Sequence, residues 1–228
     1  MKAALVLRPE PGNAATAARL ARSGIAVRCC PLFIVRPIAW SPPDPRRYDA
    51  LLLTSANAIR HAGAGLSDVA GVPVLAVGEA TARAASAAGL AIALVGTSDA
   101  ATLVAEARST GSQRLLHLSG RDHGTLPAVD QITVYASDLR PVVAEEVAAW
   151  RGHVALLHSP RAARRLAALV DEDGRAGMAI AALSPAVAKA AGTGWAAVHI
   201  APTPTDPALI ATATQLIDPP PRATDKQP

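Results

Sequence analysis

The same type of junction, an apolar run followed by a helical stretch, occurs twice in this chain, about half a chain apart. Residues 51–60 read LLLTSANAIR and residues 155–164 read ALLHSPRAAR, an offset of 104 in a chain of 228 residues. In both, the apolar run ends at a serine and an alanine-rich stretch with arginine follows at once. A repeat of this period predicts two related structural units.

Four further segment pairs repeat in the same order, and their offsets drift by only a few residues. They are 76–89 with 182–194, 97–107 with 203–213, 5–10 with 115–122, and 25–37 with 132–141. The constant order indicates an internal duplication and predicts two similar sheets.

Short apolar runs alternate with alanine-rich helical stretches along the whole chain. Strands are predicted at 4–8, 25–35, 50–55, 72–78, 91–96, 114–120, 132–137, 154–159, 178–184 and 196–201. Helices are predicted near 13–23, 56–64, 80–88, 99–109, 142–151, 161–171, 186–191 and 207–217. Continuous apolar strands separated by helices predict α/β units with parallel sheets covered on both faces. We expect the polar, proline-rich tail 218–228 to be disordered.

Three predicted helices begin with a capping residue followed by proline: Ser159–Pro160, Ser184–Pro185 and Asp206–Pro207. Such junctions follow the carboxyl ends of strands, where open α/β sheets bind their ligands. Helix N-termini carry free N–H groups, so two sets of them suit a ligand with several carboxylates or phosphates.

Composition argues against several other classes of protein. The net charge is +4, but aromatic residues make up only 3% and no run of Lys or Arg exceeds two, so we expect no nucleic-acid partner. No apolar run is long enough to span a membrane. The adjacent Cys29 and Cys30 are predicted to be reduced and buried, as in a cytoplasmic protein. No catalytic triad, metal-ligand spacing or nucleotide-binding loop is present, so no cofactor or metal is expected.

Eight motifs taken together resemble the uroporphyrinogen-III synthase family over about residues 4–217. They are LRPE (7–10), LLLTSANAIR, VGEATARAASAAG, LHLSGRD, VYAS, LLHSPRAARRL, LSPAVAKAAG with Trp195, and PTPTDPALI. The resemblance implies two flavodoxin-like parallel-sheet domains joined by a two-segment linker. One domain would comprise 1–36 plus 138–228 and the other 37–137, whereas the residues alone equally allow two contiguous halves.

The resemblance also implies the reaction, which is cyclisation of hydroxymethylbilane to uroporphyrinogen III with loss of water and inversion of ring D. The bilane loses its hydroxyl with push from a pyrrole nitrogen and closes unaided to the wrong isomer. The enzyme therefore has mainly to position the chain of rings. It would be a cofactor-free lyase of tetrapyrrole and heme biosynthesis, cytoplasmic and monomeric, with no membrane partner.

The family motifs mark Tyr135 as the catalytic residue, which would help the hydroxyl to leave through its phenol. The substrate-binding residues would be Arg8, Thr54, Ser55, Gly78, Thr81, Ser159 and Ser184. Each has a purely structural alternative: packing for the tyrosine, capping for Thr54 and the serines, a tight turn for Gly78 and Thr81, and solvation for the arginine.

Two departures from the family leave a rival function open. Only eleven residues, 121–131, separate two strands where the family has a full helix, so one sheet face is expected to be exposed or covered by a partner. Val187 stands where the family often has threonine. The alternative is a non-catalytic two-domain binding module for an anionic small molecule; a flavin or nucleotide protein is a weaker third possibility.

Overall fold

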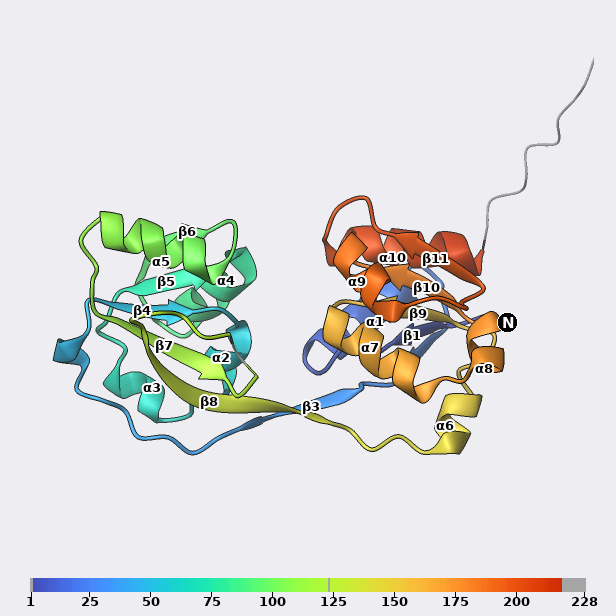
Figure 1. Ribbon diagram of the computed structural model, residues 1–228, viewed down its shortest axis with the longest axis horizontal. Coiled ribbons are helices and arrows are strands. Elements are labelled where there is room, and N and C mark those ends of the chain that lie inside the picture. The colour runs from blue at the N-terminus through green and yellow to red at the C-terminus, as the bar shows by residue number, and fades with distance from the viewer. Residues whose placement is uncertain (1, 123, 219–228) are drawn as a thin grey trace, which may run out of the picture. The chain divides into compact units, whose positions relative to one another are not determined.

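The structure is a computed structural model that describes residues 2–122 and 124–218, and it divides into two α/β units (Figure 1). The first unit comprises the described residues up to Ile34 and from Leu139 on, and the second comprises Val35–Asp138. Both boundaries fall inside strands, β3 (Phe33–Pro37) and β8 (Asp130–Leu139). The predicted boundaries lie within two residues of these positions. Residues 219–228 of the predicted disordered tail lie outside the described residues.

Five strands form the sheet of the first unit, in the order β11-β10-β9-β1-β2. Their bounds are β1 (Ala4–Val6), β2 (Val27–Cys29), β9 (Val154–Leu157), β10 (Ala179–Ala182) and β11 (Ala197–Ile200). Every pair is parallel. Two helices pack on each face: α7 (Pro160–Leu169) and α9 (Pro185–Ala191) on one, α1 (Gly12–Arg22) and α10 (Asp206–Ile217) on the other. The short helices α6 (Ala144–Ala148) and α8 (Glu172–Ala176) complete the unit.

Six strands form the sheet of the second unit, in the order β3-β8-β7-β4-β5-β6. The remaining bounds are β4 (Ala50–Leu53), β5 (Val74–Val77), β6 (Ile92–Gly96) and β7 (Leu115–Gly120). The pairs from β8 through β7, β4 and β5 to β6 are all parallel. Helices α2 (Ala56–His61) and α4 (Glu79–Ala87) cover one face and α5 (Ala100–Ser109) covers the other. A 3₁₀ turn (Pro45–Arg47) and α3 (Gly65–Asp68) lie in the connections.

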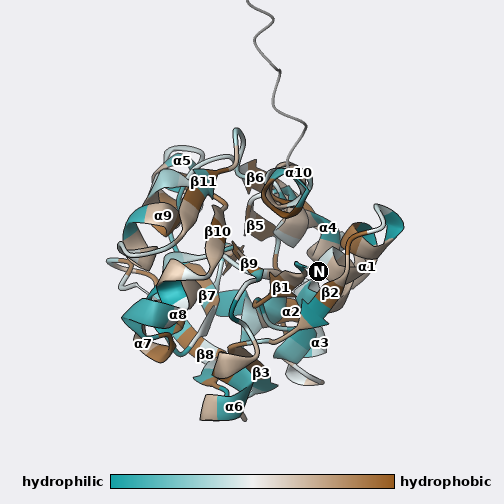
Figure 2. Ribbon diagram, turned by 90° about the vertical axis from the view of Figure 1, so that its right-hand side faces the viewer, coloured by the Kyte–Doolittle hydropathy of each residue, from teal (hydrophilic) through white to brown (hydrophobic). Residues whose placement is uncertain are grey.

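Both faces of each sheet are buried, which explains the continuous apolar runs in the sequence. Leu51 and Leu53 of β4 pack with α2 and α4, whereas Ala50 and Leu52 pack on the opposite face with α5. Successive strand side chains point to opposite faces, so a strand covered on both sides must be apolar throughout. Figure 2 shows the resulting hydrophobic colour on strands such as β10 and on helix α10. No helix in the described part of the chain is long and apolar enough to cross a membrane.

The single strand predicted over 25–35 is wrong, because the structure has two strands there in different sheets. β2 ends at Cys29, and β3 begins at Phe33. Pro31 lies between them and has no N–H to continue a ladder. Since β2 is an edge strand of its sheet, Cys29 is exposed, contrary to expectation, and only Cys30 is buried. Both cysteines are free.

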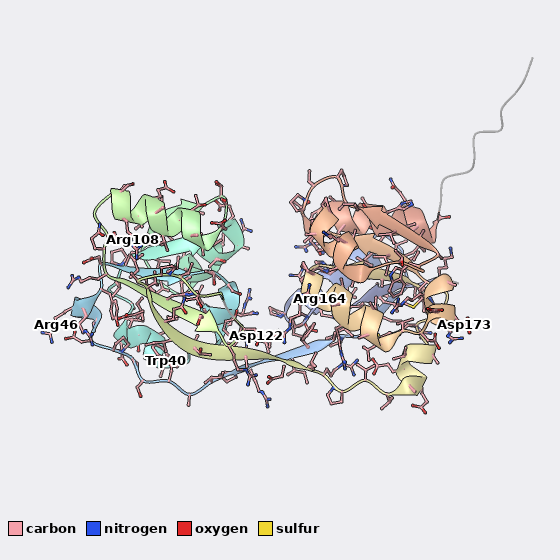
Figure 3. All side chains as sticks on the ribbon, viewed as in Figure 1. Trp40, Arg46, Arg108, Asp122, Arg164 and Asp173 are labelled. Atoms are coloured by element: carbon pink, nitrogen blue, oxygen red, sulfur yellow. The ribbon has the colours of Figure 1, made fainter. Side chains whose placement is uncertain are left out.

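The short segment between β7 and β8 contains no helix among its described residues, as predicted from its length. The sheet face there is nevertheless covered by the segment itself, which corrects the expected exposed or partner-covered face. Leu126 and Val129 pack against the cluster around α5. Arg108, at the end of α5 and labelled in Figure 3, donates to the carbonyls of Pro127 (3.1 Å) and Ala128 (2.7 Å).

The fold predicts that Asn13 stabilises the turn between β1 and α1. Asn13 is fully buried and donates to the carbonyls of Val6 (2.7 Å) and Arg8 (2.9 Å). Asn13→Ala leaves the Val6 carbonyl without this buried donor, so we expect a loss of about 2 kcal/mol in the free energy of unfolding. The measurement is chemical denaturation. The matched control is Asn57→Ala, also at the second position of a helix, whose side chain accepts a hydrogen bond from the exposed Arg60; an equal loss there would contradict the prediction.

Candidate functional site at the carboxyl edges of the sheets

The predicted site residues gather at the carboxyl edge of the sheet in each unit. Parallel pairing brings all strand ends of one sheet to the same edge. In the first unit this edge carries Arg8 after β1, Ser159 after β9 and Ser184 after β10. In the second unit it carries Thr54, Ser55, Gly78 and Tyr135, with Thr81 in the first turn of α4. The three strand-end groups of the first unit thus lie on one edge, and those of the second unit on another.

The three serines cap the helices that follow them. Ser55, Ser159 and Ser184 accept hydrogen bonds from the main-chain N–H groups of Asn57 (3.2 Å), Ala162 (3.2 Å) and Val187 (3.4 Å). Their predicted structural role is therefore confirmed. A cap satisfies only one of the free N–H groups in the first turn, so capping leaves donors for a ligand. Val187 itself is buried in the core, and the loop after β10 has no hydroxyl at that position.

Gly78 gives the loop after β5 an accessible backbone. Its φ of +81° lies in the region that favours glycine, and apart from its chain neighbours no residue lies within 4 Å of where a Cβ would stand. The side chain of Thr81 is buried at 5% exposure, and its N–H donates to the Gly78 carbonyl at 3.1 Å. The part of this loop that a ligand reaches first is thus the main chain rather than the threonine hydroxyl.

Tyr135 is seated against Gly120 on the neighbouring strand β7. A Cβ on Gly120 would stand 2.6 Å from Cζ and 2.8 Å from the hydroxyl of Tyr135, so only glycine leaves room for this ring position. The register pairs the two residues directly, and the N–H of Arg121 donates to the Tyr135 carbonyl at 2.9 Å. The half-buried ring also lies 6.3 Å, centroid to centroid, from His61.

Thr54 has a partner that the sequence did not reveal. Its hydroxyl lies 3.0 Å from Nε2 of the buried His117 on the neighbouring strand β7. This contact fixes the orientation of the threonine side chain at the sheet edge. No role was predicted for His117, because nothing in the spacing of the six histidines indicated a partner.

A polar cluster around Asp206 occupies the same edge in the first unit. We call Arg8, Thr16, Arg19, His158 and Asp206 the Asp206 cluster. Oδ1 of Asp206 accepts from Thr16 Oγ1 (2.8 Å), His158 Nε2 (2.8 Å) and Arg8 Nη1 (3.5 Å), and Oδ2 accepts from Arg19 Nη1 (2.5 Å). The structural alternative for Arg8 was a side chain that contacts only solvent. The structure differs, because the Arg8 guanidinium contacts this carboxylate.

Asp206 itself was predicted to cap helix α10, and this prediction is wrong. The preceding Thr205 is the cap: its Oγ1 accepts from the N–H of Ala208 at 3.4 Å. Asp206 stands at the first helical position, where its carboxylate turns to the guanidinium groups and to His158. A threonine beside an aspartate offers two candidate caps, and contacts made far along the chain decide between them.

Electrostatics keeps Asp206 ionised and His158 neutral at neutral pH. Burial alone raises the pKa of Asp206, but hydrogen bonds from His158, Thr16 and Arg19 outweigh burial and hold this pKa well below its usual range. Burial lowers the pKa of His158; the Asp206 hydrogen bond opposes that shift and the charge of Arg8 adds to it. The Asp206 cluster therefore carries two positive charges and one negative charge.

Two other arginines near the edges, Arg121 and Arg161, make contacts with other side chains. Arg121 pairs with Asp138, which also pairs with Arg36 of β3. Arg161 of α7 lies over the Phe33 ring, with its guanidinium carbon 4.5 Å from the ring centroid.

These features define an α/β protein of two units, each with a largely parallel sheet whose carboxyl edge carries polar residues. A family model described as uroporphyrinogen-III synthase HemD matches residues 14–211. The chain belongs to the uroporphyrinogen-III synthase family. No curated protein sequence gives a significant match.

Two solved structures share the fold. The crystal structure of uroporphyrinogen-III synthetase from Helicobacter pylori 26695 has a TM-score of 0.67 and 15% identity, covering 95% of this chain and 100% of that one. A mutant uroporphyrinogen III synthase from the extremely thermophilic bacterium Thermus thermophilus has a TM-score of 0.54 and 15% identity, covering 94% and 98%. At these identities the likeness establishes the fold.

The packing of the Tyr135 ring against Gly120 predicts a specific effect of Gly120→Ala. The new methyl group displaces the phenol, and we expect synthase activity to fall about tenfold while the melting temperature changes by only a few degrees, because the half-buried ring swings outward. Product analysis and thermal unfolding measure the two effects. Gly71→Ala is the control, since nothing lies within 4 Å of its Cβ position. Full activity in the Gly120 variant would contradict the prediction.

The environment of His158 predicts a pKa below the ordinary value of about 6.5. Since the unfolded chain takes up this proton first as pH falls, His158 costs stability as the pH drops below about 6.5. Removing the charge in Arg8→Ala raises the pKa of His158, whereas Arg22→Ala at the far end of α1 leaves it unchanged. NMR titration of the imidazole measures both shifts, and a wild-type pKa above about 6.5 would refute the assignment.

Proposed function

We propose that this protein cyclises hydroxymethylbilane to uroporphyrinogen III, with loss of water and inversion of ring D. The observation that carries the proposal is the family match over residues 14–211. Family membership favours an enzyme over the non-catalytic binding module. The protein acts as a lyase in tetrapyrrole biosynthesis, and we propose that it works as a cytoplasmic monomer without a cofactor.

The two units are, on this proposal, flavodoxin-like domains that arose by duplication. Strand order supports this assignment. Numbered along the chain, the first sheet reads 2-1-3-4-5 from β2 to β11, an order known in doubly wound folds. The second sheet gives the same order as a circular permutation. If β7 and β8 are numbered 1 and 2, and β4, β5 and β6 are numbered 3, 4 and 5, the sheet reads 2-1-3-4-5 from β8 to β6, with β3 added at the edge. The domains are those of the structural division, with β3 and β8 as the two linker segments.

The substrate carries eight carboxylates, and the sheet edges offer donors of matching chemistry. The first turns after Ser55, Ser159 and Ser184 supply main-chain N–H groups, Gly78 supplies an open backbone, and Thr54 supplies a hydroxyl. Arg8 adds a positive charge. Groups of this kind hold carboxylates in place without acting as strong acids or bases, and positioning is what decides which isomer forms.

Tyr135 assists departure of the hydroxyl in this proposal. Push from the pyrrole nitrogen breaks the carbon–oxygen bond, and the phenol donates a hydrogen bond to the oxygen as negative charge develops on it. The proton released from that pyrrole N–H balances the proton that completes the departing water. The resulting methylene carbon bonds to the ring D carbon that already carries the bridge to ring C, which gives a spiro intermediate. The old bridge bond then breaks and re-forms at the free α carbon of ring D, and loss of the proton from that carbon completes the inverted ring. The half-buried position of Tyr135 at the carboxyl edge, fixed by Gly120, supports this role.

The test is a coupled assay in which hydroxymethylbilane is generated in situ and the oxidised products are separated as type I and type III isomers. The wild-type protein is expected to give a large excess of type III. Tyr135→Phe removes one hydrogen bond to a charged oxygen, so we expect its turnover to fall about 10- to 100-fold.

Tyr48→Phe is the matched control, since the chain has only two tyrosines and Tyr48 donates to Asp130 at the opposite, amino edge. Its activity should equal that of the wild type. Type I product alone from folded wild-type protein would refute the proposed function. A type III excess unchanged by Tyr135→Phe would refute the role of the tyrosine and leave positioning as the mechanism.

A further inference from the structure

The Asp206 cluster presents two guanidinium groups that are held around a largely buried carboxylate. We propose that Asp206 is a positioning residue that holds Arg8 and Arg19 at the carboxyl edge of the first sheet as a paired guanidinium site for substrate carboxylates. The proposal rests on the proposed function for the identity of the ligand. The geometry of the cluster supports it in three ways.

The first support is the number of donors on Asp206. Thr16, His158 and Arg19 contact its two oxygens at 2.5–2.8 Å, whereas Arg8 reaches Oδ1 only at 3.5 Å. A buried carboxylate that loses its partners is costly, but here three close donors remain if Arg8 turns away. The carboxylate therefore stays hydrogen-bonded when the Arg8 guanidinium engages a ligand.

The second support is the pattern of exposure. The side chain of Asp206 is 13% exposed, whereas those of Arg8 and Arg19 are 34% and 45% exposed. A ligand approaching the cluster thus meets guanidinium groups first. With His158 neutral, two positive charges outnumber one negative charge, and two adjacent guanidinium groups suit a planar carboxylate.

The third support is that the local chain makes room for Arg8. A Cβ on Gly12 would stand 2.3 Å from Nε of Arg8, so the glycine opens the space that the guanidinium fills. The buried Asn13 holds the Arg8 carbonyl at 2.9 Å. Thr205 takes over the capping of α10 and leaves the Asp206 carboxylate available to the arginines. Different elements thus hold the main chain of Arg8, leave space for its guanidinium and supply its counter-charge.

The test uses the sign of the effect of Asp206→Asn on the full-length protein. If Asp206 only repels an anionic substrate, removing its charge tightens binding. If it positions the arginines, the same substitution weakens binding, and we expect KM for hydroxymethylbilane to rise about fivefold to tenfold with kcat changed less than about twofold. Arg8→Ala should raise KM as much, and the double variant should be no worse than Arg8→Ala, because the residues act as a unit.

Uroporphyrin III, the oxidised product, provides a binding readout independent of catalysis. Its dissociation constant, measured by fluorescence, should rise in Asp206→Asn, Arg8→Ala and Arg19→Ala. Arg22→Ala is the control, because it removes one positive charge from the same helix outside the cluster and should change binding less than about twofold. Thermal unfolding confirms that each variant is folded.

Each result decides the inference. Tighter or unchanged binding of uroporphyrin III in folded Asp206→Asn would overturn it, as would an equal loss in Arg22→Ala. If the wild-type protein makes only the type I isomer yet the variants bind uroporphyrin III in the predicted order, the proposed function fails and the paired guanidinium site stands. A wild-type protein that binds no uroporphyrin III would contradict the paired site directly.

Discussion

Parallel hydrogen bonding between strands is the constraint on which the other features depend. In a parallel ladder every strand of a sheet runs in the same direction, so each crossover returns to the amino edge and every strand ends at the carboxyl edge. The helices needed for these crossovers begin at that edge, and their free N–H groups collect there. The location of the candidate site thus follows from the strand direction, and the residues at the strand ends determine its chemistry.

At the carboxyl edge of the first sheet, a polar side chain forms hydrogen bonds with distant residues instead of capping its own helix. Asp99 caps α5 through the N–H of Thr102, whereas Asp206 lies one position inside α10 and does not cap it. In the first unit Thr205 serves as the cap, and the carboxylate contacts residues up to 198 positions away. The free energy gained from two guanidinium groups and a histidine outweighs a capping bond worth about 1 kcal/mol.

Much of the fold was predictable because its signals are local. Continuous apolar runs indicated strands buried on both faces, and the serine–proline pairs at 159–160 and 184–185 correctly marked two helix starts. The strand over 25–35 was wrong because composition does not show that the chain leaves one sheet at Pro31. Likewise, the length of 121–131 indicated a missing helix, but not that Leu126 and Val129 would cover the sheet in its place.

The candidate site was only partly predictable, since its key contacts join distant segments. The repeat and the motifs pointed to Arg8, Thr54 and Tyr135, which lie at the sheet edges. The partners that orient them, Asp206, His117 and Gly120, are brought close by strand order and register. The offset of 104 residues does place His158 opposite Thr54, and that correspondence was the one available signal for a second polar group at this position.

The central claim is that the carboxyl edges of the two sheets bind the carboxylates of a tetrapyrrole. The most direct measurement is an NMR map of main-chain amide shifts on titration with uroporphyrin III. The account predicts that the largest changes fall in the first turns after Ser55, Ser159 and Ser184 and at Gly78. Changes confined to the opposite edge of the second unit, at the cavity of about 400 Å³ lined by Arg47, Tyr48 and Arg114, would contradict it.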